Sequence, residues 1–251
     1  MDPILKVTNL TIGYGGTPIL KDISFEVFPG EIFVIMGGSG CGKSSLLKHL
    51  MGLLTPIAGD IFHEGKNFTQ SDPEEKNAIL KKIGVLYQGG ALWSSMTLQE
   101  NVALPLEEFT HLSSDTIQLL VEYKLSLVGL KGYENFYPSQ ISGGMRKRAA
   151  LARALALDPV LLFLDEPSAG LDPITSKRLD ELIQEIKDGL GTTIVLVTHE
   201  LESIFSIGTR AIFLDSISQS ILATGTPKDL KENPQNPALQ QFLNRKTSLF
   251  P

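Results

Sequence analysis

A short glycine-rich loop carries residues whose types and spacing could bind phosphate. Within residues 33–50, FVIMGGSGCGKSSLLKHL, the residues Gly37, Gly42, Lys43 and Ser44 fit the phosphate-binding spacing G-x-x-x-x-G-K-[ST]. Glycines let the backbone bend so that successive N–H groups point at anionic oxygens, and the start of the following helix adds further donors. We expect the Lys43 ammonium to reach the β- and γ-phosphates of a nucleotide and the Ser44 hydroxyl to bind Mg²⁺.

Two adjacent acids follow an apolar run further along the chain. The segment LLFLDEP, residues 161–167, is typical of a buried strand that ends in Asp165 and Glu166. At the carboxyl end of a strand, Asp165 is placed to hold Mg²⁺ through its water ligands, and Glu166 is placed to polarise an attacking water. The alternative is a strand that runs into a solvated acidic turn, and the phosphate-binding loop upstream disfavours it.

A second possible anion site precedes the long helical pattern of ISGGMRKRAALARAL, residues 141–155. Ser142, Gly143 and Gly144 offer a hydroxyl and bare N–H groups at the beginning of that helix. One chain seldom needs two phosphate cradles so far apart in sequence for one nucleotide. We therefore predict that two copies of the chain face each other, with each phosphate-binding loop closed by the other copy's Ser-Gly-Gly.

The elements that must position these residues follow the periods of strands and helices. Residues 32–36 and 83–88 are typical of buried strands, and residues 44–51 of a helix. Asp72 is expected to cap a helix that begins at Pro73. The pattern is strand-rich over residues 4–36, helical over 97–157, and alternates between strands and helices from 160 onward. This alternation predicts a parallel sheet with crossover helices, interrupted by a helical insertion.

Composition limits the class of protein. The chain has 251 residues, of which 42% are hydrophobic and 20% charged, and no apolar run approaches the ~20 residues of a membrane span. The first ten residues lack a signal-peptide pattern, so we expect a cytosolic protein. The net charge of −6 argues against a nucleic-acid partner. The single cysteine, Cys41, excludes an internal disulfide and is interpreted as a small filler in the loop.

A run of basic residues also bears on the nucleic-acid question. Arg146, Lys147, Arg148 and Arg153 lie on one expected helix of an acidic protein. We expect them to serve packing and interfaces rather than nucleic-acid binding.

Taken together, the motifs resemble those of the ATP-binding subunits of ABC transporters, over about residues 4–230. The resemblance implies an α/β fold: a P-loop NTPase core of the ABC ATPase type with an antiparallel β subdomain and a helical insertion subdomain. The core with its β subdomain is expected at 1–88 and 156–230, the helical subdomain at 89–155, and a C-terminal helix and tail at 231–251. ATP and Mg²⁺ are the implied ligands.

The resemblance assigns ATP-binding roles on the core. Tyr14 resembles the aromatic residue that stacks on adenine, and His199, after TIVLVT, resembles the switch histidine that contacts the γ-phosphate. The matching phosphate-binding loop consists of Gly37, Gly38, Ser39, Gly40, Cys41, Gly42, Lys43, Ser44 and Ser45.

Further matches complete the catalytic set. Gln88 resembles the glutamine that senses metal and water at the junction with the helical part, while Asp165 and Glu166 resemble the metal-holding and catalytic carboxylates. Ser142 to Met145 match the family signature, with SGGM where the family usually has SGGQ. Asp172, in SAGLD, resembles the loop residue that crosses the dimer interface.

A narrower resemblance concerns the transported substance. The strings at residues 88–106, 142–159 and 236–245 are similar to the Mla-type subfamily of lipid transporters. That resemblance implies a homodimer on the cytoplasmic face of the inner membrane, bound to an integral-membrane permease, and often a STAS-domain subunit and a periplasmic lipid-binding protein. Leu92, Trp93 and Met96 are expected to face the permease.

Other functions remain open from sequence. Within transporters, the alternatives are a small-solute importer and a lipoprotein-release system. A non-transport ABC ATPase of DNA repair or translation is a further alternative. It is disfavoured because the chain has one ATP-binding domain and no sustained heptads.

Overall fold

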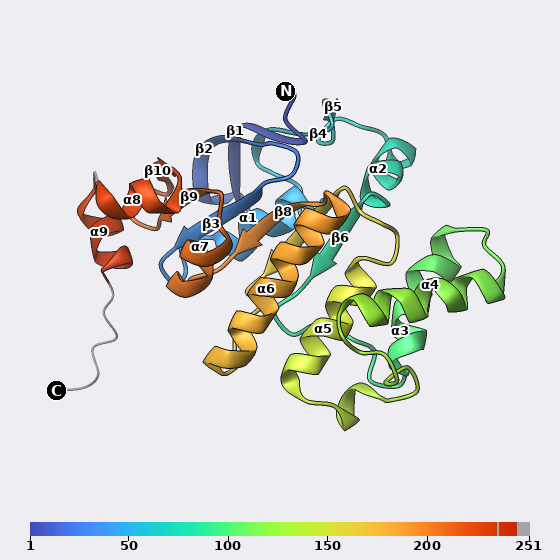
Figure 1. Cartoon of the computed structure of the whole chain (residues 1–251). Coiled ribbons are helices and arrows are strands. Elements are labelled where there is room, and N and C mark those ends of the chain that lie inside the picture. Colours follow the sequence, from blue (N-terminus) through green and yellow to red (C-terminus); the bar gives the residue numbers. More distant parts are fainter. Residues whose placement is uncertain (235, 245–251) are drawn as a thin grey trace. The chain divides into compact units, whose positions relative to one another are not determined.

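The computed structural model describes residues 1–234 and 236–244, and the chain divides into two compact units. One unit comprises residues 1–76 together with the chain from 194 onward, and the other comprises residues 77–193. Figure 1 shows the elements of both units in sequence colours.

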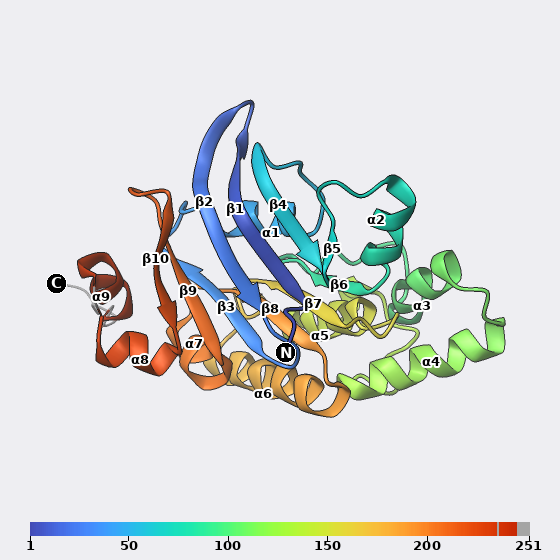
Figure 2. The same cartoon turned by 90° about the horizontal axis from the view of Figure 1, so that it is seen from above.

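The first unit contains an antiparallel sheet with the strand order β2-β1-β4-β5. Figure 2 shows its long strands side by side. Its strands are β1 (Leu5–Tyr14), β2 (Thr17–Val27), β4 (Ala58–His63) and β5 (Lys66–Asn67). The register of β1 shifts near Asn9, which has a φ of 47°. Gly59 lies against this bulge, because a Cβ there would come within 2.3 Å of the Asn9 carbonyl oxygen.

A second, mostly parallel set of strands in the same unit carries the glycine-rich loop. These strands lie in the order β10-β9-β3-β8, where β9, β3 and β8 are parallel and β10 is antiparallel to β9. The strands β3 (Ile32–Gly37) and β8 (Thr193–Val197) are buried at every position, as expected for parallel strands covered on both faces. The others are β9 (Arg210–Asp215) and β10 (Ser220–Gly225). Four helices join or follow them: α1 (Lys43–Leu50), α7 (Leu201–Ile207), α8 (Pro227–Glu232) and α9 (Pro237–Leu243).

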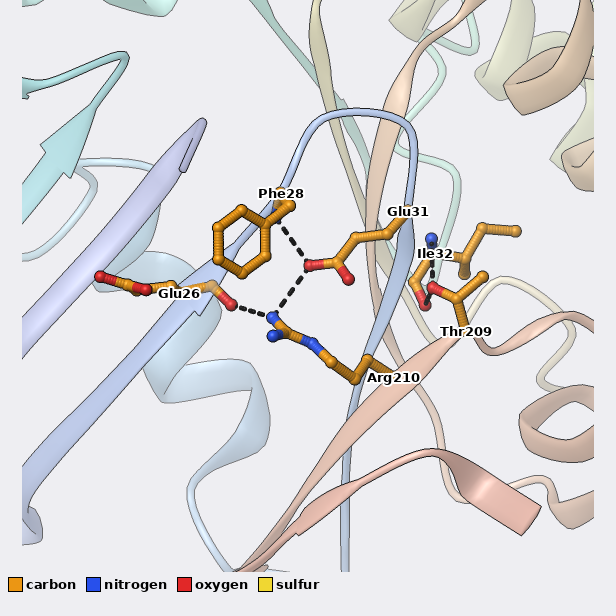
Figure 3. Close-up of polar contacts among 6 residues, drawn as sticks. All are labelled: Glu26, Phe28, Glu31, Ile32, Thr209 and Arg210. Atoms are coloured by element: carbon orange, nitrogen blue, oxygen red, sulfur yellow. Dashed lines mark hydrogen bonds and ion pairs between the residues drawn. The ribbon is translucent and has the colours of Figure 1, made fainter. Parts of the chain in front are cut away.

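A partly buried polar cluster joins the beginning of β9 to β2 and β3 (Figure 3). The Arg210 guanidinium donates to the Glu26 carbonyl and to the Glu31 carboxylate, the latter at 3.0 Å. The Thr209 hydroxyl accepts from the Ile32 N–H at 3.0 Å and donates to the Ile32 carbonyl at 2.9 Å. Burial raises the pKa of Glu31, and Arg210 partly opposes that shift. The cluster therefore fixes the register of strand β3, which leads into the loop.

The second unit is a parallel strand pair with a long helical connection. The strands are β6 (Ile83–Leu86) and β7 (Leu161–Asp165). Between them lie α3 (Leu98–Phe109), α4 (Ser114–Leu127), the 3₁₀ turn η1 (Pro138–Gln140) and α5 (Gly143–Ala154), and after them lies α6 (Pro173–Leu190). Figure 1 shows α3, α4 and α5 packed together. The helix α2 (Pro73–Leu80) spans the division between the units.

Most elements expected from sequence are confirmed. Strand β3 and helix α1 lie within one residue of the expected 32–36 and 44–51, and Asp72 caps α2 by accepting from the Glu75 N–H at 2.9 Å. The short elements β5, β10 and α7 were not expected, because two to seven residues give too little periodicity.

Two further expectations have different outcomes. The C-terminal helix is confirmed as α9, whereas the tail at 245–251 lies outside the described residues. The subdomain boundaries at 88/89 and 155/156 stay a prediction. Within residues 1–234 and 236–244, no helix has the length and hydropathy needed to cross a membrane.

Candidate functional site

The glycine-rich loop connects β3 to α1 and has the open backbone that phosphate binding requires. Gly40 and Gly42 have φ angles of 76° and 95°, in the region where a side chain is strained, and Gly42 is the N-cap of α1. Gly37 leaves no room for a side chain, since a Cβ there would come within 2.5 Å of the Leu214 carbonyl oxygen. These positions therefore tolerate only glycine without a local rearrangement.

The Lys43 side chain folds back onto the first residues of the loop. Its buried ammonium donates to the carbonyl oxygens of Gly37 and Gly38, at 3.0 Å each. An ammonium binds an anionic oxygen more strongly than a neutral carbonyl, so these contacts hold the cation ready beside the loop N–H groups.

Cys41 packs beneath the same loop. Only 1% of the residue is exposed, and its Sγ lies 4.0 Å from the Lys43 Nζ. Burial raises the pKa of the Cys41 thiol, while the neighbouring Lys43 charge opposes that shift. The thiol is thus buried, and the interpretation of Cys41 as a small filler stays a prediction.

Tyr14 stands beside the loop at the end of β1. Its hydroxyl lies 3.1 Å from the Ser45 Oγ, and 49% of the residue is exposed. The tyrosine is therefore tethered at its tip, and its ring remains accessible for stacking.

His199 follows β8 in the same unit. It is half-exposed, and its Nε2 lies 3.7 Å from the Glu200 carboxylate. The Glu200 N–H donates to the Thr198 hydroxyl at 3.0 Å, which fixes the turn that presents the imidazole.

In the second unit, Asp165 is the last residue of strand β7 and Glu166 follows it; both are buried, with Glu166 only 7% exposed. Glu166 has a φ of 47°, a left-handed conformation that costs about 1–3 kcal/mol for a residue with a side chain. The Ala169 N–H donates to the Glu166 carbonyl at 3.2 Å. Such strain directly after a buried strand is typical of functional sites.

Lys147 lies near the site, although its sequence position did not indicate a role there. Its ammonium donates to the backbone carbonyls of Gln88 and Glu166, the latter at 3.5 Å. Burial lowers the pKa of Lys147, and the carboxylates of Asp165 and Glu166 oppose that shift. The only sequence signal was its place in the basic run, which gives no information about contacts to residues far away in the chain.

The other cations of the basic run also bind backbone carbonyls. Arg146 donates to Ile141 at 3.0 Å, Arg148 to Val128 at 3.0 Å, and Arg153 to Ala91 at 2.7 Å. The expected packing role of the run is therefore confirmed.

The Ser-Gly-Gly segment forms the beginning of α5. Ser142 is the N-cap, and its Oγ accepts from the Met145 N–H at 3.2 Å. A Cβ at Gly144 would lie 2.6 Å from the Thr175 Cγ2, so glycine permits close packing there. Ser142, Gly144 and Met145 line a cavity of 510 Å³ within this unit.

Asp172 and Asn101 each hold a segment of the second unit in place through hydrogen bonds. Asp172 caps α6 by accepting from the N–H groups of Ile174 and Thr175 at 3.1 and 3.0 Å. Hydrogen bonds from the Thr175 side chain and from these N–H groups lower the pKa of Asp172. The buried Asn101 amide donates to the carbonyls of Trp93 and Met96, each at 3.1 Å. The loop after Gln88 is thereby held in place, with the Trp93 side chain 58% exposed.

The structure thus groups the expected residues within each unit. Tyr14 meets the phosphate-binding loop in the first unit, and Lys147 joins Gln88 to Glu166 in the second. The role of each residue toward a nucleotide stays a prediction.

Comparison with known proteins identifies the family. The ABC transporter family model matches residues 20–169, and the chain belongs to this family as an ATP-binding and ATP-hydrolysing subunit. It is 39% identical over 240 residues to the intermembrane phospholipid transport system ATP-binding protein MlaF of Haemophilus influenzae, covering 96% of this chain and 90% of that protein.

Two other similarities are informative. The chain is 39% identical over 244 residues to the probable ribonucleotide transport ATP-binding protein mkl of Mycobacterium leprae, covering 97% of this chain and 70% of that protein. Among solved structures, it resembles the dimeric post-hydrolysis state of the ATP-binding cassette MJ0796 bound to ADP and Pi. The TM-score is 0.80 with 29% identity, over 89% of this chain and 98% of the other. The predicted ABC ATPase fold is confirmed.

Proposed function

We propose that the loop from Gly37 to Ser45 binds the ATP phosphates while Tyr14 stacks on the adenine. The observation that carries this proposal is the Lys43 ammonium, held 3.0 Å from two loop carbonyls beside the N-terminus of α1. An incoming phosphate oxygen replaces these neutral partners with a charged one, which strengthens the contact.

The residues present also fit Mg²⁺. The Ser44 hydroxyl and the Asp165 carboxylate are oxygen donors, the type that Mg²⁺ prefers, and Gln88 supplies a further amide oxygen. The part of the chain that the structure describes holds no cluster of three His, Cys, Asp or Glu side chains suited to a metal. Mg²⁺ does not need one, because it keeps water and substrate phosphate among its ligands. When bound, it neutralises charge on the β- and γ-phosphates.

Hydrolysis then depends mainly on positioning and charge. The Glu166 carboxylate accepts a proton from water as the water oxygen bonds to the γ-phosphorus. The bond between the γ-phosphorus and the bridging oxygen breaks, and ADP leaves with that electron pair. Lys43 offsets the developing negative charge, Gln88 orients the water, and His199 holds the γ-phosphate.

ATP is sandwiched between two copies of the chain. Ser142, Gly143 and Gly144 of one copy close the phosphate-binding loop of the other, and Asp172 lies at their interface. This proposal is supported by the open N-terminus of α5 and by the dimeric state of the similar cassette. Closure on ATP and reopening after hydrolysis supply the motion that drives a membrane partner.

The proposed cargo is phospholipid. The support is the 39% identity to the Haemophilus influenzae phospholipid transport protein over 96% of the chain. The subunit would bind an integral-membrane permease at the cytoplasmic face of the inner membrane, with the exposed Trp93 on the contact surface. A STAS-domain subunit and a periplasmic lipid-binding protein complete the proposed complex.

Deleting the gene should weaken the outer-membrane barrier without affecting nutrient uptake, because only lipid transport is lost. The measurement is survival in detergent and in large hydrophobic antibiotics. The deletion strain complemented with Lys43→Ala should be as sensitive as the deletion strain, while wild-type complementation restores resistance.

A ribonucleotide is the second candidate cargo, favoured by the similarity to the Mycobacterium leprae protein. A deletion strain with a normal barrier and a specific loss of ribonucleotide uptake would refute the lipid proposal and support this one. The ATPase assignment would stand in both cases.

Cys41 offers a direct test of phosphate binding at the loop. We expect a maleimide to label this thiol slowly in the native protein and rapidly after unfolding in urea, because the thiol is buried and its pKa is raised. Saturating ATP–Mg²⁺ should slow the native reaction further, and the labelled protein should fail to bind ATP. Equal native labelling rates with and without nucleotide would contradict closure of the loop over phosphate.

A further inference from the structure

The Lys147 ammonium joins three segments of the second unit that are far apart in sequence. Lys147 lies on α5, and its two acceptors are the carbonyls of Gln88, after β6, and of Glu166, after β7. We propose that Lys147, on the helix capped by Ser142, is a positioning residue for ATP hydrolysis. It holds Gln88 and Glu166 in the arrangement that hydrolysis needs. This inference rests on the roles proposed above for Gln88 and Glu166.

The contact with Glu166 acts at a strained backbone position. With a φ of 47°, the Glu166 carbonyl points in a direction that needs support from its surroundings. The Glu166 carbonyl accepts from the Ala169 N–H at 3.2 Å and from the Lys147 ammonium at 3.5 Å. Without the ammonium, the local turn can relax toward an ordinary conformation, and the attached carboxylate would move with it.

The contact with Gln88 acts on the other expected water-binding side chain. Gln88 lies in a turn in which the Gly90 N–H donates to the Tyr87 carbonyl at 2.8 Å. Lys147 fixes the carbonyl of Gln88 itself, so the side chain starts from a defined backbone. One ammonium therefore sets the separation between the residue that orients water and the residue that accepts its proton.

The same contact links catalysis to dimer closure. Ser142 caps α5, and Lys147 lies little more than one turn further along this helix. A nucleotide of the second copy that engages Ser142 would act on the helix that carries Lys147. The chain's own Gln88 and Glu166 would then move with the segment that senses the partner's ATP.

Lys147 differs from a buried lysine that only supports folding. Lys124 is such a residue: it is buried in the same unit and pairs with the Asp158 carboxylate. Its ammonium is engaged with Asp158 rather than with Gln88 or Glu166. The variant Lys124→Met is therefore the matched control for losing a buried ammonium.

The test uses the purified transporter complex with Lys147→Met, Lys147→Arg or Lys124→Met. In Lys147→Met we expect kcat for ATP to fall by about tenfold or more, because small misplacements of reacting groups have effects of this size. The Kd for ATP should stay within about twofold of wild type. Lys147→Arg should recover most of the lost kcat, since it keeps a donating cation.

Hydrogen exchange distinguishes positioning from general destabilisation. In Lys147→Met the amides of Gly90 and Ala169 should exchange faster, whereas in Lys124→Met they should exchange as in wild type. A Lys147→Met enzyme with unchanged kcat would overturn the inference, and so would a loss of kcat without faster local exchange. Normal turnover in Glu166→Gln would instead refute the proposed catalytic role, so the two failures can be told apart.

Discussion

Replacing Glu166 with glutamine should slow ATP hydrolysis by at least about a hundredfold while ATP still binds. A general base contributes about 10²–10⁴-fold to such a reaction, and the glutamine amide cannot accept the proton of the attacking water. Glutamine is nearly isosteric, so the buried position and the φ of 47° should persist. The measurement is the rate of phosphate release by the assembled transporter, together with the Kd for ATP.

The matched control is Glu122→Gln, which neutralises an exposed carboxylate of the same unit. Glu122 accepts a hydrogen bond from the exposed Gln118 amide at 3.0 Å, and neutralising Glu122 should leave turnover unchanged. Near-normal hydrolysis by Glu166→Gln would remove this residue from the catalytic role.

The Lys43→Ala variant should lose both ATP affinity and hydrolysis. Hydrogen bonds to charged groups contribute about 1.5–3 kcal/mol, so the Kd for ATP should rise by roughly tenfold to a hundredfold. Hydrolysis should become undetectable, because the same cation offsets charge on the γ-phosphate during the reaction. Isothermal titration with ATP–Mg²⁺ and a turnover assay measure the two effects.

Lys48→Ala is the matched control for this change. Lys48 lies on the same helix but is exposed in its last turn, so its loss should alter neither quantity. If Lys43→Ala bound and hydrolysed ATP as wild type does, the assignment of the phosphate-binding loop would be wrong.

The sequence predicted those parts of the site whose residues are neighbours in the chain. The loop from Gly37 to Ser44 depends on local backbone conformation, and the beginning of the helix after Ser142 depends on contacts within three residues. Local chemistry of this kind is visible as spacing.

Contacts between distant segments could not be predicted in the same way. The Tyr14–Ser45 hydrogen bond joins residues 31 apart, and the Lys147–Gln88 bond joins residues 59 apart. The left-handed conformation of Glu166 was also hidden, because glutamate carries no sequence signal for positive φ. Such features depend on which segments the fold brings together.

The transported molecule could not be predicted for a different reason. The family fold fixes how ATP drives motion, whereas a fold by itself does not specify the transported molecule. The proposed lipid cargo therefore depends on similarity to named relatives rather than on any contact in this chain.

The central claim is that ATP binds between two copies of the chain, and the mass of the Glu166→Gln protein in solution tests it most directly. We predict that light scattering gives a monomer mass without nucleotide and twice that mass with ATP, with two ATP molecules retained per dimer. Adding Ser142→Arg should prevent the doubling, because a bulky side chain would block the contact with the second copy's nucleotide. A mass that does not respond to ATP, or a doubling that persists with Ser142→Arg, would contradict the claim.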